Sequence, residues 1–96
     1  MPLIISAKVR EKLAGKKPPV TQIEIEQCFT NRVGKYLLDS REKHDSDPPT
    51  RWFIAETDFG RKLKIAFIAT TDGNIVIRTA YDPNQDEIRI YKKFGA

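Results

Sequence analysis

The sequence predicts an α+β fold in which helices pack on an antiparallel sheet of three to four strands, and three observations support this prediction. Residues 51–83 contain three successive runs rich in β-branched and aromatic residues. Turn-forming residues separate these runs, Asp58-Phe59-Gly60 at the first junction and Asp72-Gly73-Asn74 at the second. Two helical patterns precede the stretch and one follows it. The 96 residues are therefore expected to form one domain, 1–96.

Each helix has a recognisable start. The first is predicted to begin after Ser6, whose hydroxyl suits an N-cap, and the second after Thr21, where TQIE fits a capping box. The carboxy-terminal helix covers QDEIRIYKKF after Asn84, with acidic residues in its first turn and lysines in its last, as the helix dipole favours. A short edge strand at 35–39 leads into a polar loop at 40–49.

The last two strands are predicted to form a hairpin around a two-residue type I′ turn at Asp72-Gly73. Glycine has no Cβ and accepts the positive φ angles that this turn requires, and aspartate tolerates them. Counting back from the turn gives the cross-strand pairs Lys64 with Tyr81, Ala66 with Thr79, and Ile68 with Ile77.

Alternation along the two strands sorts their side chains onto two faces. The apolar face is expected to hold Leu63, Ile65, Phe67, Ala69, Val76 and Ala80, with Arg78 as a charged intruder. The mixed face is expected to hold Lys64, Ile68, Ile75, Ile77, Thr79 and Tyr81. If the helices gather on the apolar face, the mixed face is left to hold a substrate.

Composition narrows the classes of function. The chain carries a net charge of +4 and has a pI near 9.3, which favours phosphates or an acidic protein as partners. No apolar run reaches the roughly 20 residues of a membrane-spanning helix, and the amino terminus lacks the features of a secretory signal. A cytoplasmic protein without membrane contacts is expected, and the formation of homo-oligomers is left open.

Cysteine and histidine give no sign of a metal or nucleophile site. Cys28 is the single cysteine and His44 the single histidine, so neither a disulfide nor a zinc-type cluster is expected. Cys28 falls on the apolar stripe of the second helix and is interpreted as a core residue. Because phosphate loops, nucleophile elbows and metal-binding helices are also absent, no metal and no cofactor is predicted.

Basic and hydroxyl-bearing residues are concentrated in the last two strands and the final helix. Cleavage of RNA by its own 2′-hydroxyl needs no metal, and Arg, Lys and Tyr can bind phosphate, orient the hydroxyl and stabilise the transition state. The candidate catalytic residues are Arg61, Lys64, Thr79, Tyr81 and Tyr91. The candidate RNA-binding residues are Lys62, Arg78 and Arg89, together with His44 and Arg51 in or beside the polar loop.

The same residues allow a plainer interpretation. Lys62 and Lys64 can be ordinary solvent-facing charges, and Tyr81 and Tyr91 can be amphipathic residues at the edge of the core. Trp52 could stack on an RNA base, but a tryptophan in a strand of a small domain is more often a core residue.

A family resemblance favours the ribonuclease hypothesis. The run GRKLKIAFI, the hairpin after it, IVIRTAYDP and the helical DEIRIYKK together resemble the small toxins of the BrnT type, within the RelE-like ribonuclease superfamily. The likeness extends back over the lysine-rich first helix and the T-x-x-E helix, so it covers most of the chain. It implies a RelE/barnase-like fold, metal-independent cleavage of RNA, and neutralisation by a cognate antitoxin protein.

Within this resemblance Arg61 matches the strand arginine of the family, Thr79 stands where the family often has serine, and Tyr91 matches the tyrosine of the last helix. Tyr81 is a departure, because such toxins commonly carry a basic residue at its position. Losing that charge would weaken stabilisation of the transition state, as expected in a degenerate member of the family. Lys64, across the hairpin, is the candidate to supply the charge instead.

Two further functions are weighed. Short proteins similar to this one have been given the name of a dinitrogenase reductase ADP-ribosyl hydrolase, but the hydrolases of that name are longer, helical and hold two metal ions with clustered carboxylates. The aspartates of this chain lie singly in loops and turns, so that activity is disfavoured. The alternative kept is a non-catalytic module that binds protein or nucleic acid through the same sheet face and the basic loop.

Overall fold

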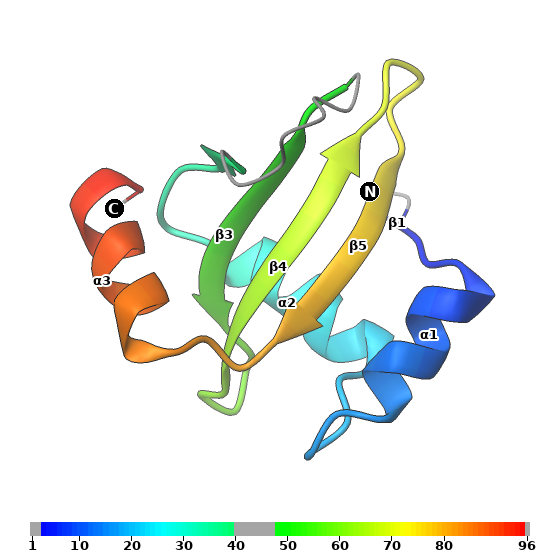
Figure 1. Cartoon of the computed structure of the whole chain (residues 1–96), viewed down its shortest axis with the longest axis horizontal. Helices are drawn as coiled ribbons and strands as arrows, with labels where there is room; N and C mark the ends of the chain where they lie inside the picture. The colour runs from blue at the N-terminus through cyan, green and yellow to red at the C-terminus, as the bar shows by residue number, and fades with distance from the viewer. Residues whose placement is uncertain (1–2, 40–47, 96) are drawn as a thin grey trace.

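The structure is a computed structural model that describes residues 3–39 and 48–95. It contains a five-stranded sheet with one helix behind it and a helix beside each edge (Figure 1). In chain order the elements are β1 (Leu3–Ile4), α1 (Ala7–Ala14), α2 (Gln22–Asn31), β2 (Leu37–Leu38), β3 (Thr50–Glu56), β4 (Lys62–Ala69), β5 (Ile75–Tyr81) and α3 (Gln85–Phe94). The predicted α+β class is confirmed.

The sheet is larger and more mixed than predicted. Its strand order is β1-β5-β4-β3-β2, and β1 pairs in parallel with β5 while the other neighbours are antiparallel. The prediction of three to four antiparallel strands was wrong in this respect. Leu3–Ile4 pairs at only two positions, and two residues are too few to show the alternation by which a strand is recognised in a sequence.

The helix starts are confirmed. The Ser6 hydroxyl accepts a hydrogen bond from the Val9 amide, and both Thr21 and Asn84 form reciprocal capping boxes with the glutamate three residues on. These bonds satisfy amide groups that have no partner inside the helix, which fixes where each helix begins.

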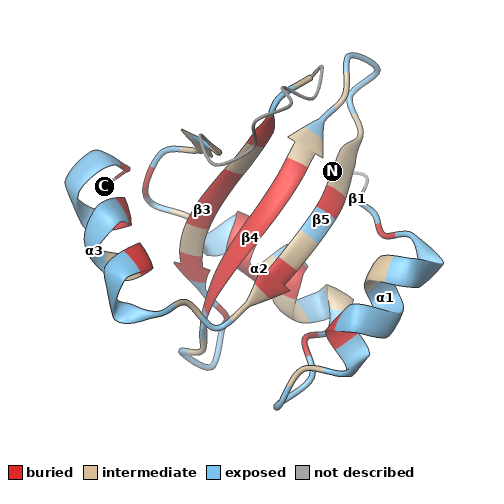
Figure 2. Cartoon of the chain, in the orientation of Figure 1, coloured by how far each residue is buried: buried red, intermediate tan, exposed pale blue. Residues whose placement is uncertain are grey.

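The core lies between α2 and the sheet. Figure 2 shows that β4, the central strand, is buried along most of its length. The largest fully buried side chains are Phe53, Phe67, Ile25, Leu63, Ile65, Ile77 and Cys28. The Cys28 thiol donates to the carbonyl oxygen of Ala55 at 3.7 Å, and burial raises the pKa of Cys28 to about 12. Cys28 is therefore an inert core residue, as interpreted from the sequence.

Helix α3 lies on the opposite side of the sheet from α2. Its Tyr91 ring packs on Trp52 with the ring centroids 5.7 Å apart, and Trp52 points away from the face that carries Phe53. The expectation that all helices gather on the apolar face was wrong for α3, because the buried Trp52 gives the second face an apolar patch of its own. Tyr91 is buried there, whereas Phe94 remains exposed.

The hairpin between β4 and β5 closes through a longer loop than predicted. Thr70 and Asn74 form the closing pair of the hairpin, so the loop spans residues 71–73. Within this loop only Gly73 has a positive φ, 89°. The backbone is therefore not a type I′ turn, which needs two positive φ angles. The extra loop residue shifts the register near the turn, so Ile68 lies opposite Val76 rather than Ile77.

A β-bulge at Arg78 restores the predicted register. The pairing shifts by one residue in the middle of the hairpin, and beyond that point Ala66 lies opposite Thr79 and Lys64 opposite Tyr81, as predicted. A bulge places one extra residue in one strand and re-aims the side chains beside it.

The bulge also changes the two faces. Ile77 joins the core with 1% exposure, although the sequence placed it on the mixed face. Arg78 is exposed rather than an intruder among the core residues, and Val76 is only half-buried. A one-residue shift moves side chains to the other face of a strand, which explains each of these corrections.

Two remaining expectations concern the loop and the membrane. Of the predicted polar loop, residues 40–47, with His44, lie outside the described residues. Among residues 3–39 and 48–95, no helix combines the length and the apolar character needed to cross a membrane.

Candidate functional site

A polar cleft opens on the face of the sheet opposite α2, which we call the open face. The cleft has a volume of about 230 Å³. Its lining residues are Lys12, Asp39, Thr50, Lys64, Ala66, Arg78, Thr79 and Tyr81. Helix α1 and strands β3, β4 and β5 thus contribute to one concavity. Three of the five candidate catalytic residues, Lys64, Thr79 and Tyr81, come together here.

Lys64 forms the floor of the cleft. Its side chain is only 3% exposed, and its ammonium donates to Glu87 Oε2 at 2.8 Å. The same ammonium lies 4.5 Å from the centre of the Trp52 ring and 5.6 Å from that of Tyr81. A buried lysine needs such a partner, because an unpaired charge away from water is very costly.

Glu87 joins the open face to α3. Besides the Lys64 bond, its Oε2 accepts a hydrogen bond from the Tyr81 hydroxyl at 2.5 Å. Its Oε1 accepts from the Asn84 amide at 3.0 Å as part of the capping box. We call Lys64, Tyr81 and Glu87 the Lys64 cluster.

The Lys64 cluster holds Glu87 ionised. Burial alone would raise the pKa of this carboxyl group, but the bonds from Lys64, Tyr81 and Asn84 outweigh burial and lower the pKa to about 2. A carboxylate with so low a pKa is a weak proton acceptor at neutral pH. Glu87 therefore suits the positioning of Lys64 and Tyr81 better than proton transfer.

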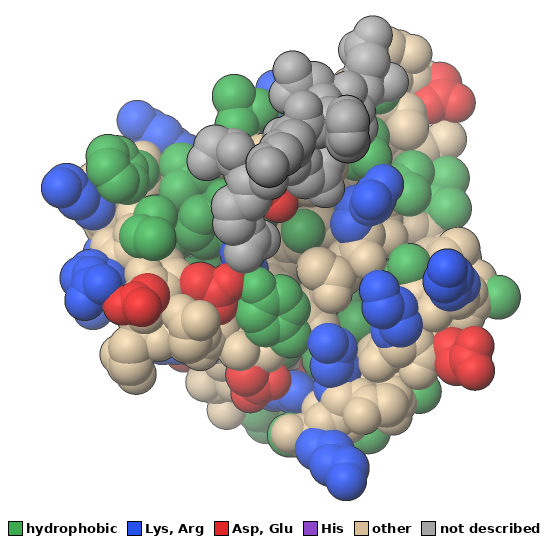
Figure 3. Space-filling model, viewed as in Figure 1, with side chains coloured by type: hydrophobic (Ala, Val, Ile, Leu, Met, Phe, Trp, Pro, Cys, Tyr) green, Lys and Arg blue, Asp and Glu red, His purple; other side chains and the backbone are tan. Residues whose placement is uncertain are grey.

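Cations surround the mouth of the cleft. The bulge exposes Arg78 on the cleft side of β5, and Lys12 reaches the cleft from α1. Lys16 lies with its ammonium 5.5 Å from the centre of the Tyr81 ring. Figure 3 shows Lys and Arg side chains gathered over α1 and the neighbouring part of β5. Asp39 is the one acidic residue among those that line the cleft within the described part of the chain.

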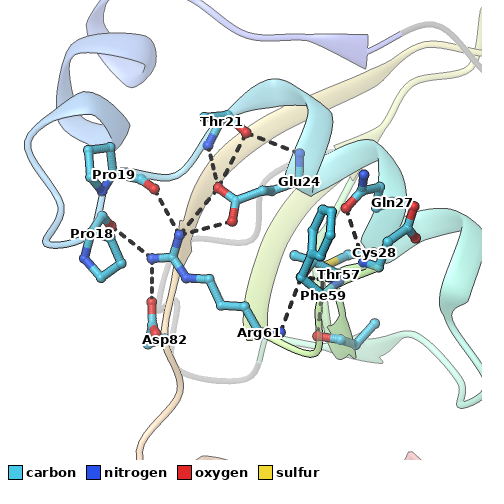
Figure 4. A network of polar contacts seen from close by, with 12 residues as sticks. Pro18, Pro19, Thr21, Glu24, Gln27, Cys28, Thr57, Phe59, Arg61 and Asp82 are labelled. Carbon is cyan, nitrogen blue, oxygen red and sulfur yellow. Dashed lines mark hydrogen bonds and ion pairs between the residues drawn. The ribbon is translucent and has the colours of Figure 1, made fainter.

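Arg61 lies outside this cleft, in a separate network (Figure 4). Its Nη1 donates to the Pro19 carbonyl at 2.8 Å and to Glu24 at 3.1 Å. Its Nη2 donates to the Pro18 carbonyl at 2.8 Å and to Asp82 Oδ1 at 2.7 Å. We call Arg61, Glu24 and Asp82, with these two carbonyls, the Arg61 cluster.

The Arg61 cluster joins three parts of the chain. Arg61, just before β4, binds the segment that precedes α2, helix α2 itself and the segment that follows β5. The hydrogen bond to Asp82 and the nearby Glu24 raise the pKa of Arg61. Burial would raise the pKa of Glu24, but the bonds from Thr21 and Arg61 lower it. These contacts use both terminal nitrogens of the guanidinium.

Tyr91 is also outside the polar cleft. Its hydroxyl donates to the Lys35 carbonyl at 2.8 Å, and burial raises the pKa of its phenol group. Together with Lys62 it lines a second cavity at the outer edge of β3. Tyr91 packs its ring on Trp52, which in turn lies beside Lys64 of the cleft.

The other candidate RNA-binding residues are scattered. Arg89 pairs with Asp86 at 2.5 Å on the solvent side of α3, with both side chains about three-quarters exposed. Arg51 lies in β3 opposite Phe67, on the same face as the core. Of this group only Arg78 reaches the cleft, since Lys62 lines the second cavity and His44 lies outside the described residues.

Sequence reasoning missed Glu87, Lys12, Asp39 and Thr50 at the site. The sequence pattern assigned Glu87 only to the first turn of a helix, where acidic residues are common. The structure shows that Glu87 also forms a capping box with Asn84, but no local signal in the sequence placed this carboxylate beside Lys64, 23 residues earlier.

Comparison with known proteins finds no relative of this chain. No family model, curated protein or solved structure matches this chain. Among the residues that the structure describes, no three His, Cys, Asp or Glu side chains lie close enough together to hold a metal ion. The arrangement on the open face is therefore the basis for a functional proposal.

Proposed function

We propose that the polar cleft binds the phosphate backbone of RNA and that the protein is a toxin-like, metal-independent endoribonuclease. The observation that carries the proposal is the meeting of Lys64, Thr79 and Tyr81 in one concave site with exposed Arg78 at its mouth. Arginine and lysine neutralise phosphates, and such contacts supply most of the affinity of proteins for nucleic acid.

The cleft offers groups for cleavage by an internal hydroxyl. In that reaction the ribose 2′-oxygen bonds to phosphorus and gives its proton to water, while the P–O5′ bond breaks and the 5′-oxygen takes a proton from water. Arg78 would neutralise the phosphate, and Thr79 would donate a hydrogen bond to a phosphate oxygen. The Tyr81 proton points to Glu87, which leaves the phenol oxygen to accept a hydrogen bond from the attacking hydroxyl and orient it.

Arg61 and Tyr91 take supporting parts in this proposal. Arg61 already donates to oxygens of four residues, and Tyr91 has a carbonyl partner in Lys35. Because neither residue lines the cleft, we assign them to holding the strands and α3 in place. The proposal includes a cognate antitoxin protein that neutralises the activity, as the resemblance to BrnT-type toxins implies.

A second candidate is a non-catalytic module that binds RNA or a protein through the same cleft. The observation that favours it is the mutual pairing within the Lys64 cluster. Both the Lys64 ammonium and the Tyr81 hydroxyl already bond Glu87, and Lys64 is 3% exposed. These groups then shape the floor while Arg78 and Lys12 make the contacts.

One pair of assays tests both candidates. Purified protein is mixed with end-labelled single-stranded RNA in a chelating buffer, and binding and cleavage are measured separately. We expect Arg78→Ala to weaken binding about tenfold and to reduce the slope of log affinity against log salt concentration by about one. Lys93→Ala, on the solvent side of α3, should change neither quantity. Tyr81→Phe should reduce cleavage more than binding.

The outcomes separate the candidates. Cleavage that produces a 2′,3′-cyclic phosphate supports the endoribonuclease, and binding with intact RNA supports the module. If wild-type protein neither binds nor cleaves RNA, or if Arg78→Ala and Lys93→Ala behave alike, the assignment of the cleft to RNA is wrong.

A further inference from the structure

The outer edge of β3 is only partly covered by its neighbour. Strand β2 pairs with β3 at two positions, Leu37 with Trp52 and Leu38 with Arg51. Continuing this antiparallel register by two residues would pair residue 35 with residue 54. That pair is not formed.

The ladder stops because Lys35 has other partners. Its amide donates to the Gly95 carbonyl at 2.6 Å, and its carbonyl accepts from the Tyr91 hydroxyl at 2.8 Å. Both backbone groups that would bond Ile54 are therefore engaged by the end of α3. The docking of α3 leaves the edge of β3 open at this point.

The backbone of Ile54 faces outward at this open edge. The Thr57 amide donates to the Arg61 carbonyl, and backbone groups of an antiparallel strand point alternately to its two sides. Residues 51, 53 and 55 therefore bond β4, whereas the backbone groups of residues 50, 52, 54 and 56 face away from it. Two bonds agree with this, since the Thr50 carbonyl accepts from the Asp39 amide and the Glu56 carbonyl accepts from the Asn31 side chain. Ile54 lies between these two residues and has no paired strand on that side among the described residues.

A groove lies along the same edge. It has a volume of about 330 Å³. Its lining residues are Asn31, Val33, Ile54, Ala55, Glu56, Lys62, Ile88, Tyr91 and Lys92. Val33 is fully exposed, and Ile88 is half-buried. We call this cavity the edge groove. An apolar groove beside an unpaired strand edge is the arrangement by which proteins bind extended peptides.

We propose that the edge groove binds an extended segment of a partner protein with apolar side chains and acidic flanking residues. The segment pairs with the outward amide and carbonyl of Ile54 and places an apolar side chain between Val33 and Ile88. Its acidic residues face Lys62 and Lys92, the two cations of the groove, which outnumber the single carboxylate of Glu56. This inference does not depend on the proposed RNA function.

Charge argues against a second copy of this chain as the occupant. Antiparallel pairing of two β3 edges around Ile54 would bring Lys62 and Lys92 of both copies to one interface. Like charges brought together at an interface repel each other and disfavour that pairing. An acidic segment meets the same groove with opposite charge.

Nuclear magnetic resonance of the full chain tests the proposal. The probes are two blocked peptides with a core of alternating valine and threonine, one flanked by glutamates and the other by lysines. We expect the glutamate peptide to shift the Ile54 amide and to bind at least tenfold more tightly than the lysine peptide. Before addition, the Ile54 amide should exchange with solvent faster than those of Phe53 and Ala55, which face β4.

Charge variants provide the matched control. Lys92→Glu should weaken binding of the glutamate peptide about tenfold, whereas Lys93→Glu, on the next and exposed residue outside the groove, should leave it within twofold. The proposal is overturned if neither peptide shifts Ile54 or if the two peptides bind equally. It is also overturned if the Ile54 shift follows protein concentration alone, since that result assigns the edge to a second copy.

Discussion

Arg61 lies just before β4 and Lys64 lies near its beginning, and both pair with a glutamate of a helix capping box, yet their surroundings differ. Arg61 bonds Glu24 of α2, and Lys64 bonds Glu87 of α3. Arg61 also bonds two carbonyls and Asp82, away from either cavity. Lys64 bonds one carboxylate and lines the polar cleft.

The difference shows how two basic residues that lie close together in the sequence serve two purposes. The planar guanidinium of Arg61 presents several donors in fixed directions, which suits it to hold separate segments together. The single ammonium of Lys64 is a point charge below a cleft where Thr79 and Tyr81 also lie. We infer that the Arg61 cluster serves mainly the fold and the Lys64 cluster serves mainly the site.

The largest expected effect is that of Arg61→Ala on stability. The change removes partners from two carboxylates and two carbonyls at once, so we expect a loss of about 3 kcal/mol in the free energy of unfolding. Urea denaturation measures it. Arg89→Ala, which breaks an exposed pair on α3, should cost less than about 0.5 kcal/mol. Equal losses for the two variants would contradict a structural role for Arg61.

The second effect is a pH dependence that Glu87→Gln should remove. The pKa of Glu87 is lowered from 4.5 to about 2 in the folded protein, so its ionised form stabilises the fold fully above pH 4.5. That stability is lost as the pH falls from 4.5 towards 2. We expect the wild type to lose about 2 kcal/mol more than Glu87→Gln across this window, after allowance for solvent screening.

Urea midpoints at pH 5.5 and pH 2.5 measure this difference. Glu24→Gln provides the comparison, because the bonds from Thr21 and Arg61 lower the pKa of Glu24 as well. A pH dependence that is unchanged in Glu87→Gln would show that the Lys64 cluster does not hold this carboxylate.

The smallest effect is that of Tyr81→Phe. Phenylalanine keeps the ring beside Lys64 but removes the hydroxyl that bonds Glu87, so stability should fall by only about 1 kcal/mol at pH 7. The pKa of Glu87, followed by carbon-13 NMR of its carboxyl group, should rise. An unchanged pKa of Glu87 would contradict the hydrogen bond from Tyr81 to Glu87.

Local patterns predicted much of the fold. Ser6, Thr21 and Asn84 marked all three helix starts because a cap is decided by a few neighbouring residues. The pair Lys64 with Tyr81 was also correct, although two errors cancelled there. The loop is one residue longer than predicted, and the bulge at Arg78 returns the register to its predicted value.

Features that depend on distant parts of the chain were not predictable in this way. The parallel strand Leu3–Ile4 forms only because β5 offers it an edge, and each residue pairs with one 72 positions later in the chain. The meeting of Glu87 with Lys64 and the open edge at Ile54 both depend on where α3 docks. The sequence analysis placed Arg61 and Lys64 in one catalytic set because they are neighbours in the chain. In the structure their side chains contact different residues, and only Lys64 lines the cleft.

A titration of the isotope-labelled full chain with oligouridylate RNA, followed by NMR, tests the contrast between the two clusters most directly. The account predicts shifts of the Arg78, Thr79 and Tyr81 amides, with the Arg61 guanidinium signal unchanged. Shifts at Arg61 and Glu24 while the amides of the cleft stay in place would contradict it, because they would assign RNA to the Arg61 cluster.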